Sequence, residues 1–304
     1  MISVIVVNWN SGLQLRRCVE SLLGEDVSEI CVVDNASCDG SASLVLDLIG
    51  VEVIFLSENI GFGAACNVGA RRVSGEFLLF INPDAAICPG GIRRVLDFVG
   101  APGNSSVGIC GVQLFDESGQ VSRTCARFPS PLGFVFQSCG VDRLIPRLGH
   151  AMAEWPHDAT RDVDQVIGAF FLVRRTVFEQ LDGFDERFFV YFEEVDFSLR
   201  ARRGGWRSVY FSEVRAFHAG GGTSRQVKAK RLFYSLRSRL LYAAKHFNIL
   251  GVTAVSFFTL LVEPISRSVL AIARGSWAGL KETWQGYAML WAWLPEWFAR
   301  GVRG

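Results

Sequence analysis

Two adjacent glutamates stand directly after an aromatic run in the stretch RFFVYFEEVDFSLRARR. If this stretch is helical, Glu193 and Asp196 share one side of the helix and Glu194 points well away from them. Asp196 is also spaced for an i,i+4 ion pair with Arg200. Glu194 has no basic partner on its own side, and an aromatic setting can raise the pKa of its carboxyl, which suits a general base. The alternative is a solvated helix start, where the helix dipole favours acidic residues.

A second group of candidate residues lies in LLFINPDAAI, residues 78 to 87. Pro83 donates no backbone hydrogen bond and disfavours helical geometry before it, so it should end a strand and fix how Asn82 and Asp84 leave it. Oxygen atoms from these two side chains suit Mg²⁺ or Mn²⁺, which share their coordination with substrate phosphates. His218, in AFHAGGGTS, can add a nitrogen ligand. The alternatives are a capped turn and a histidine packed under a glycine-rich loop.

The elements that must position these residues follow from hydrophobic periodicity. Short apolar runs predict strands at residues 2–7, 30–33, 51–56, 76–81 and near 107–114. Helical patterns lie between the first four runs, at residues 12–23, 40–49 and 62–73. Continuous apolar strands that alternate with helices indicate a parallel sheet covered on both faces. The fold class is therefore α/β, with a Rossmann-like nucleotide-binding sheet.

Polar residues follow each of the first four strands, where ligands bind in such sheets. Asn8 follows the first strand, and Asp34 ends the second, where it can accept a hydrogen bond from the imide of uracil or thymine or form an Asx-turn. Residues 59–67 form a glycine-containing strand-to-helix turn that can approach a nucleotide. The residues in it that we single out are Asn59, Gly61, Gly63 and Asn67.

Charge is divided unevenly along the 304 residues. Residues 1–199 contain 14 Lys/Arg and 26 Asp/Glu, whereas residues 200–304 contain 17 and 4. This asymmetry indicates an anionic partner for the second part, such as phosphates or lipid headgroups. We do not expect nucleic acid, because the sequence has no basic–aromatic recognition motif and no zinc-finger spacing. The eight cysteines stand singly, without a CxxC pair, which favours free thiols in a reducing compartment.

The composition changes near residue 225 to basic and aromatic helical sequence, so we expect domains at 1–225 and 226–304. Residues 249–262 are apolar, but fourteen residues are too few to span a bilayer, and Pro264 is expected to interrupt a longer helix. Many tryptophans follow, which fits a C-terminal segment lying on the cytoplasmic face of a membrane. The alternatives are a helical hairpin packed on the catalytic domain and a homodimer contact.

Seven blocks of residues 2–224 together resemble the inverting family 2 glycosyltransferases with the GT-A fold, and most of all their rhamnosyltransferase-like branch. In order, the blocks are VIVVNWN, VVDNASCDGS, ENIGFGAACNVGA, LLFINPDA, GAFFLVRR, GFDERFFVYFEEVDFSLRARRGGW and FHAGGGTS. The resemblance implies a nucleotide-sugar donor, a divalent cation (Mg²⁺ or Mn²⁺) on its diphosphate, and one-step displacement by an acceptor hydroxyl.

The same resemblance assigns roles to residues of this chain. Asp34 would bind the base, and Asn8, Asn59, Gly61 and Asn67 would line the donor site. Asn82 and Asp84 stand where many relatives have a DxD motif, with Asp84 as metal ligand and Asn82 a departure from the pattern. His218 would complete the metal site. Glu194 would be the catalytic base, and Glu193 is its rival.

We therefore expect a glycosyltransferase that moves L-rhamnose from dTDP-L-rhamnose to a lipid-linked or growing cell-surface glycan. The expected location is cytoplasmic, peripheral on the inner face of the plasma membrane. The alternatives are a UDP-hexose or UDP-galactofuranose transferase of the same fold and a non-catalytic nucleotide- or glycan-binding scaffold.

Overall fold

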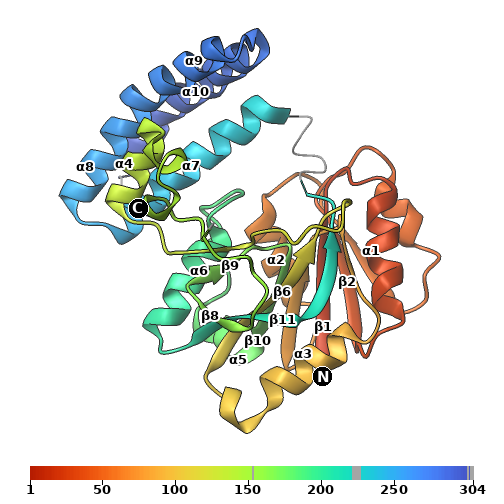
Figure 1. Cartoon of the computed structure of the whole chain (residues 1–304). Helices are drawn as coiled ribbons and strands as arrows, with labels where there is room; N and C mark the ends of the chain where they lie inside the picture. The colour runs from red at the N-terminus through yellow and green to blue at the C-terminus, as the bar shows by residue number, and fades with distance from the viewer. Residues whose placement is uncertain (153, 221–226, 300, 302–304) are drawn as a thin grey trace. The chain divides into compact units, whose positions relative to one another are not determined.

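The structure of the chain is a computed structural model that describes residues 1–152, 154–220, 227–299 and 301. It divides into two compact units, whose elements are drawn in Figure 1. The first unit contains Met1–Arg127, Trp155–Phe189 and Glu193–Thr223, and the second contains Phe128–Glu154, Val190–Phe192 and Ser224–Gly304. The domain boundary predicted between residues 225 and 226 lies outside the described residues and stays a prediction.

The first unit is built on a sheet that has nine strands among the described residues. Its order is β3 (Val51–Phe55), β2 (Glu29–Asp34), β1 (Ile2–Asn8), β4 (Phe77–Ile81), β10 (Phe170–Arg174), β6 (Val107–Phe115), β11 (Arg207–His218) and β5 (Ala85–Ile87), with β8 (Arg161–Val163) also on β11. The first four strands in this order are parallel, and β10 is antiparallel to β4. These are the four strands predicted from apolar runs, and β6 is the fifth. A two-stranded sheet joins β7 (Cys125–Ala126) and β9 (Gln165–Val166).

Helices cover both faces of this sheet. This is expected, because the strands are continuously apolar and do not alternate between apolar and polar residues. On one face, α1 (Leu13–Leu23) and α3 (Gly91–Gly100) bury their apolar sides in the same core as alternate residues of β1, β2 and β4. On the other face, α2 (Phe62–Ala70) lies against β1 and β2. Phenylalanines of β4 and β10 there contact those of α5 (Arg175–Gln180) and α6 (Glu193–Arg203). The predicted fold class is confirmed.

One predicted helix is wrong. Residues 40–49 form only a short 3₁₀-helix, Ser41–Val45. The carboxylate of Asp39 accepts hydrogen bonds from the backbone and hydroxyl of Ser41 and from the backbone of Gly12. Such local side-chain bonds compete with helical ones, so this segment is tied to the loop after β1. Further 3₁₀ turns occur at Pro102–Asn104, Val141–Arg143 and Pro146–Leu148.

The second unit is helical. It contains α4 (Pro131–Cys139), α7 (Lys228–His246), α8 (Ile249–Phe257), α9 (Glu263–Ala273) and α10 (Trp277–Ala299). Helix α4 comes from the central part of the chain, for which no helix was predicted.

The prediction that Pro264 interrupts a longer helix is also wrong. Helices α8 and α9 join through a π-helical turn, Phe258–Val262, into one helix of 25 residues, Ile249–Ala273. A π turn shifts the backbone hydrogen bonds by one residue, so the helix passes a proline that lacks an N–H without breaking. The apolar helix is thus longer than the fourteen residues read from the sequence.

Candidate active site

The ends of β1 and β2 bring Asn8 and Asp34 together. The two residues are directly paired in the parallel ladder. The Asn8 amide donates to Asp34 Oδ1 at 2.7 Å and to Ser41 Oγ at 2.8 Å, and the Ser37 backbone N–H donates to Asp34 Oδ2 at 3.2 Å. Asn8 is 0% exposed and Asp34 is 4% exposed. The hydrogen bond from Asn8 therefore fixes the orientation of the Asp34 carboxylate. That either residue contacts a donor stays a prediction.

Asn35 links this pair to the loop that precedes α2. Its amide donates to Asn59 Oδ1 at 3.0 Å and to the Gly61 carbonyl at 3.2 Å, and its oxygen accepts from Ile60 N at 2.9 Å. Our reading of the sequence singled out Asn59 and Gly61 but not Asn35. Asn35 immediately follows Asp34 and could have been singled out as another polar residue at the same strand end. Its partners in residues 59–61 lie in a different loop, and the sequence around Asn35 does not indicate them.

The start of α2 lies against the segment that leads into α6. Gly61 has a φ of +93°, and a Cβ there would lie 2.9 Å from Phe189 Cα. Phe62 N donates to the Phe189 carbonyl at 2.7 Å. Two residues further, a Cβ on Gly63 would lie 3.3 Å from Glu193 Cβ. The two glycines of GFG therefore let α2 approach the glutamate pair closely.

Asn67, also on α2, is bonded within the protein at both ends of its amide. It donates to the Phe184 carbonyl at 2.8 Å and to Glu186 Oε1 at 3.0 Å, and it accepts from Phe184 N at 2.9 Å. The geometry supports a positioning role, in which Asn67 holds the loop before α6. Its predicted place in the donor site stays a prediction.

Beyond β4, Asp84 and His218 meet, although they are far apart in the sequence. His218 Nε2 lies 3.3 Å from Asp84 Oδ1, because β5 and β11 pair with His218 opposite Ala85. Asn82 donates its backbone N–H to the Ala169 carbonyl at 3.2 Å, and its own carbonyl lies 3.5 Å from the Cys18 thiol. Burial, together with the charge of Asp84, raises the pKa of that thiol.

The two glutamates at the start of α6 are both desolvated. Glu193 is 5% exposed, and the Oε2 atom of each glutamate is buried without a hydrogen-bond partner among the described residues. Burial raises the pKa of Glu193 well above its usual value, and the neighbouring charge of Glu194 raises it further. Burial also raises the pKa of Glu194. A buried carboxyl with a raised pKa holds a proton more readily than an exposed one, which suits a general base.

The backbone just before the pair is strained. Tyr191 and Phe192 both have left-handed conformations, with φ of 67° and 71°. Bulky residues rarely adopt this region, and such strain tends to occur at functional sites. Further along α6, Arg200 Nε donates to Asp196 Oδ2 at 2.7 Å, so the predicted i,i+4 pair is confirmed.

These parts belong to one edge of the first unit. The strand end at Asn82 is bonded to Ala169, and the adjacent Gly168 faces the ring of Phe62, which lies 3.7 Å from where a Cβ would be. Phe62 is bonded in turn to Phe189, just before the glutamate pair. A continuous set of contacts thus connects the NPD segment with the start of α6, along the carboxyl ends of the parallel strands.

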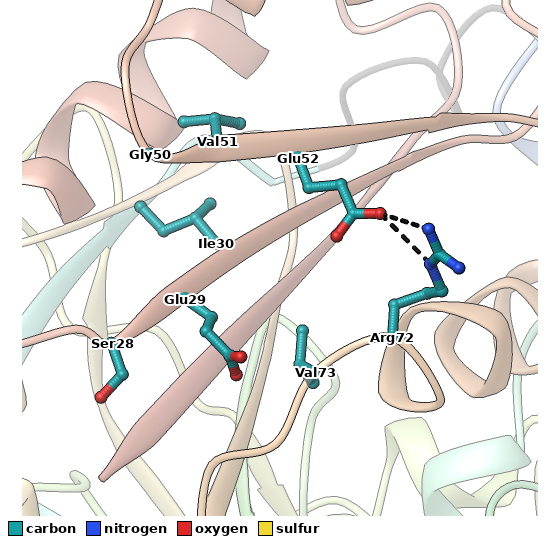
Figure 2. Close-up of a pocket in the computed structure, with 8 residues that line it drawn as sticks. All are labelled: Ser28, Glu29, Ile30, Gly50, Val51, Glu52, Arg72 and Val73. Carbon is teal, nitrogen blue, oxygen red and sulfur yellow. Dashed lines mark hydrogen bonds and ion pairs between the residues drawn. The ribbon is translucent and has the colours of Figure 1, made fainter.

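A hollow of about 340 Å³ lies at the opposite edge, where β2 and β3 begin. Figure 2 shows its Arg72 side chain joined to Glu52, at 2.8 Å. Glu29 accepts from Ser74 N at 2.7 Å and from the Ser3 hydroxyl at 2.5 Å. Because its charged groups are already paired and it is remote from the strand ends, we do not assign the chemistry to this hollow.

The described residues contain no group of three or more His, Cys, Asp or Glu side chains arranged around a metal position. Asp84 and His218 offer one oxygen and one nitrogen donor. Mg²⁺ and similar cations are commonly held by one or two protein ligands, with substrate phosphates and water completing the coordination. The pair therefore fits a cation that arrives with a diphosphate.

The fold is that of known glycosyltransferases. The chain superimposes with a TM-score of 0.55 on the mannosyltransferase PcManGT from Pyrobaculum calidifontis, solved in complex with GDP-Man and Mn²⁺. The match covers 99% of this chain and 87% of that one, at 17% sequence identity, which shows the GT-A type of fold alone. Residues 3–182 match the family model described as Glycosyl transferase family 2, so the chain belongs to that family and is a glycosyltransferase.

Within the family, the chain resembles rhamnosyltransferases. It is 28% identical to the N-acetylglucosaminyl-diphospho-decaprenol L-rhamnosyltransferase of Mycobacterium tuberculosis over 262 residues, which is 80% of this chain and 84% of that protein. It is 24% identical to rhamnosyltransferase WbbL of Escherichia coli over 259 residues, 81% of this chain and 93% of that protein. The predicted membership of a rhamnosyltransferase-like branch is confirmed.

Proposed function

We propose that the chain transfers L-rhamnose from dTDP-L-rhamnose to a hydroxyl of a lipid-linked or growing cell-surface glycan, with inversion at the anomeric carbon. The observation that carries this proposal is the desolvated glutamate pair at the start of α6, held against α2 at the edge where the strands end. The names of the two rhamnosyltransferase relatives support the choice of sugar.

Glu194 is the proposed base. Glu193 packs towards Gly63 of α2 and is the more deeply buried of the two, whereas Glu194 keeps some exposed surface. Glu194 takes the proton of the acceptor hydroxyl while that oxygen forms a bond to C1 of the sugar. The bond from C1 to the diphosphate oxygen breaks in the same step, and the nucleoside diphosphate leaves with the electron pair.

Asp84 and His218 are the proposed ligands of a Mg²⁺ or Mn²⁺ ion. When bound, such an ion neutralises negative charge that develops on a leaving diphosphate. The chain's own contribution is to hold the two ligand atoms close, through the pairing of β5 with β11. Asp34 is the proposed partner of the base, oriented by Asn8, and Asn35 holds the loop with Asn59 and Gly61 near it.

The lipid-linked acceptor and the membrane location rest on the same two observations. The Mycobacterium relative is named for a diphospho-decaprenol glycolipid, and this chain has an apolar, tryptophan-rich second unit. Both support a lipid-linked acceptor and a peripheral location on the inner face of the plasma membrane.

A donor screen tests the proposed chemistry. With Mn²⁺ and a lipid-linked acceptor fraction, we expect dTDP-L-rhamnose to give a product heavier by one deoxyhexose, detected by mass spectrometry. Product only from UDP-hexose or UDP-galactofuranose would replace rhamnose by the alternative donors. Thermal stabilisation by GDP-sugars alone would contradict both.

A further inference from the structure

The 25-residue helix Ile249–Ala273 is long and apolar enough to cross a membrane, and only a third of its most apolar stretch is buried within the structure. At 1.5 Å per residue it measures about 37 Å, against about 30 Å for a hydrocarbon core. Length therefore permits a transmembrane helix. The distribution of side chains around the helix decides between crossing a bilayer and lying on it.

A band of exposed apolar residues runs along this helix. Every fourth residue is exposed, and most of these residues are aliphatic or aromatic: Ile249, Phe257, Leu261, Ile265 and Val269. Residues four apart are neighbours on a helix surface, and at about 100° per residue each step turns the row by about 40°, so these residues form a band that winds slowly around the helix. We call these five residues the apolar stripe.

Helix α10 adds an aromatic row to the same unit. Its exposed aromatic residues recur at every seventh position: Trp277, Trp284, Trp291 and Phe298. Trp277 is 79% exposed, and the rings of Trp284 and Trp291 are neighbours at 6.0 Å. Helices α9 and α10 run side by side in Figure 1 and pack against each other. Tryptophans at this density are typical of the water–lipid interface.

On α9, the side that faces away from Ile265 is polar and buried. Glu263, 2% exposed, forms ion pairs with Arg239 of α7 and with Arg267, whose Nε lies 2.8 Å from Glu263 Oε1. Ser138 of α4 donates to the same carboxylate at 3.2 Å, and Ser266 donates to the Ser138 carbonyl at 2.6 Å. Removing one partner of such a buried pair is strongly destabilising. This helix therefore cannot cross hydrocarbon apart from α4 and α7.

We propose that the apolar stripe and the aromatic row lie in the plane of an anionic bilayer surface, immersed to the depth of their side chains, with no helix crossing. This deepens the proposed peripheral location and does not depend on the proposed sugar chemistry. Helix α9 presents apolar residues to lipid on one side and the Glu263 network to the protein on the other, which is the pattern of an interfacial helix.

The net positive charge of the second unit favours an anionic lipid surface, rather than a second copy of this chain, as the partner of the apolar stripe. Residues 224–304 contain 12 Lys/Arg and three Asp/Glu. Arg274 and Lys281, on either side of the turn between α9 and α10, are exposed. A two-fold symmetric dimer through this face would bring like charges towards each other, whereas phosphatidylglycerol headgroups would neutralise them.

Flotation of the full chain with vesicles tests the proposal. We expect binding to vesicles of phosphatidylcholine with about one-third phosphatidylglycerol, and weaker binding to phosphatidylcholine alone. For the double variant Leu261→Ser/Ile265→Ser, we expect the vesicle partition coefficient to fall at least about tenfold, because two apolar side chains no longer enter the lipid. The matched control is Leu46→Ser/Ile49→Ser, two exposed aliphatic residues of the first unit, which should bind as the wild type does.

Two further measurements complete the test. Alkaline carbonate should release the chain from cell membranes, whereas retention after carbonate would indicate a crossing helix and overturn the in-plane arrangement. Equal vesicle binding by the stripe variant, or loss of a dimer rather than of lipid binding in analytical ultracentrifugation, would also overturn it. Glu194→Gln should still float with vesicles, and the stripe variant should still be stabilised thermally by Mn²⁺ with dTDP in solution. The two results distinguish failure of the proposed chemistry from failure of the proposed membrane surface.

Discussion

At the scale of single residues, the two glutamates at the start of α6 are expected to differ in function because they differ in surroundings. Glu193 is packed against Gly63, and its pKa is raised first by burial and then by Glu194. Glutamine keeps the shape of a packed carboxyl but cannot take up a proton, so it replaces a packing residue well and a base poorly. We expect Glu194→Gln to lower kcat by about 10²- to 10⁴-fold and Glu193→Gln by less than about tenfold. Product formation with saturating donor measures this.

The control for that pair is Glu179→Gln, which changes an exposed glutamate that pairs with Arg175 on α5 and should leave kcat unchanged. All three variants should keep the wild-type melting temperature to within a few degrees at pH 6. If Glu193→Gln is the inactive variant and Glu194→Gln is active, the rival assignment of the base is correct.

The raised pKa of Glu193 also makes stability depend on pH. A carboxyl whose pKa is higher in the folded chain than in the unfolded chain contributes stability that is fully present below the unfolded value, about 4.3. That contribution is lost as pH rises towards the folded pKa, at up to about 1.4 kcal/mol per pH unit. Glu193→Gln removes the dependence, so it should gain stability relative to the wild type between pH 5 and pH 8. Urea unfolding at both pH values measures the difference, and parallel profiles would disprove the raised pKa.

At the scale of elements, the start of α2 depends on a glycine. Gly61 combines a φ of +93° with the close approach of Phe189, so any Cβ there is both strained and in collision with backbone. We expect Gly61→Ala to lower the free energy of unfolding by about 2–4 kcal/mol, measured by urea denaturation. It should also weaken donor binding, because the segment before Glu193 must move.

Gly24→Ala is the matched control for α2. Gly24 follows α1 with a φ of −87°, and a Cβ there would meet nothing within 4 Å. We expect this substitution to change the free energy of unfolding by less than about 1 kcal/mol. A Gly61→Ala variant as stable as Gly24→Ala would show that Phe189 yields easily and that the close approach does not order the site.

At the scale of the whole molecule, metal and nucleotide should stabilise the fold together. Asp84 and His218 supply only two ligand atoms, so dTDP phosphates are needed to hold a cation firmly. We expect Mn²⁺ with dTDP to raise the melting temperature by more than the sum of the separate effects. At one hundred times the dissociation constant the gain is about 2.7 kcal/mol. EDTA should abolish transfer, and added Mn²⁺ should restore it.

Asp84→Ala should remove this joint effect while leaving the melting temperature without ligands close to that of the wild type. The control is Asp26→Asn, which changes an exposed partner of Arg93 and should preserve the joint effect. A joint effect that survives Asp84→Ala would place the cation elsewhere.

The sequence by itself determined the features that arise from neighbours along the chain. The apolar runs of β1, β2 and β4 are uninterrupted because these strands are buried on both faces, and that pattern already predicts a covered parallel sheet. The Asp196–Arg200 pair follows from helical spacing alone. The polar residues at the strand ends could also be predicted, because each one directly follows an apolar run in the sequence. The parallel register of β1 and β2 then places Asn8 beside Asp34.

Only the tertiary structure decided the contacts that join distant segments. The meeting of Asp84 with His218, the hold of Asn35 on Asn59 and the burial of Glu263 between two arginines depend on which elements pack together, and no local periodicity encodes that choice. The π turn before Pro264 was missed because a proline reads locally as a helix end. In the folded chain, packing of α8 and α9 against α4 keeps the helix continuous despite the missing hydrogen bond.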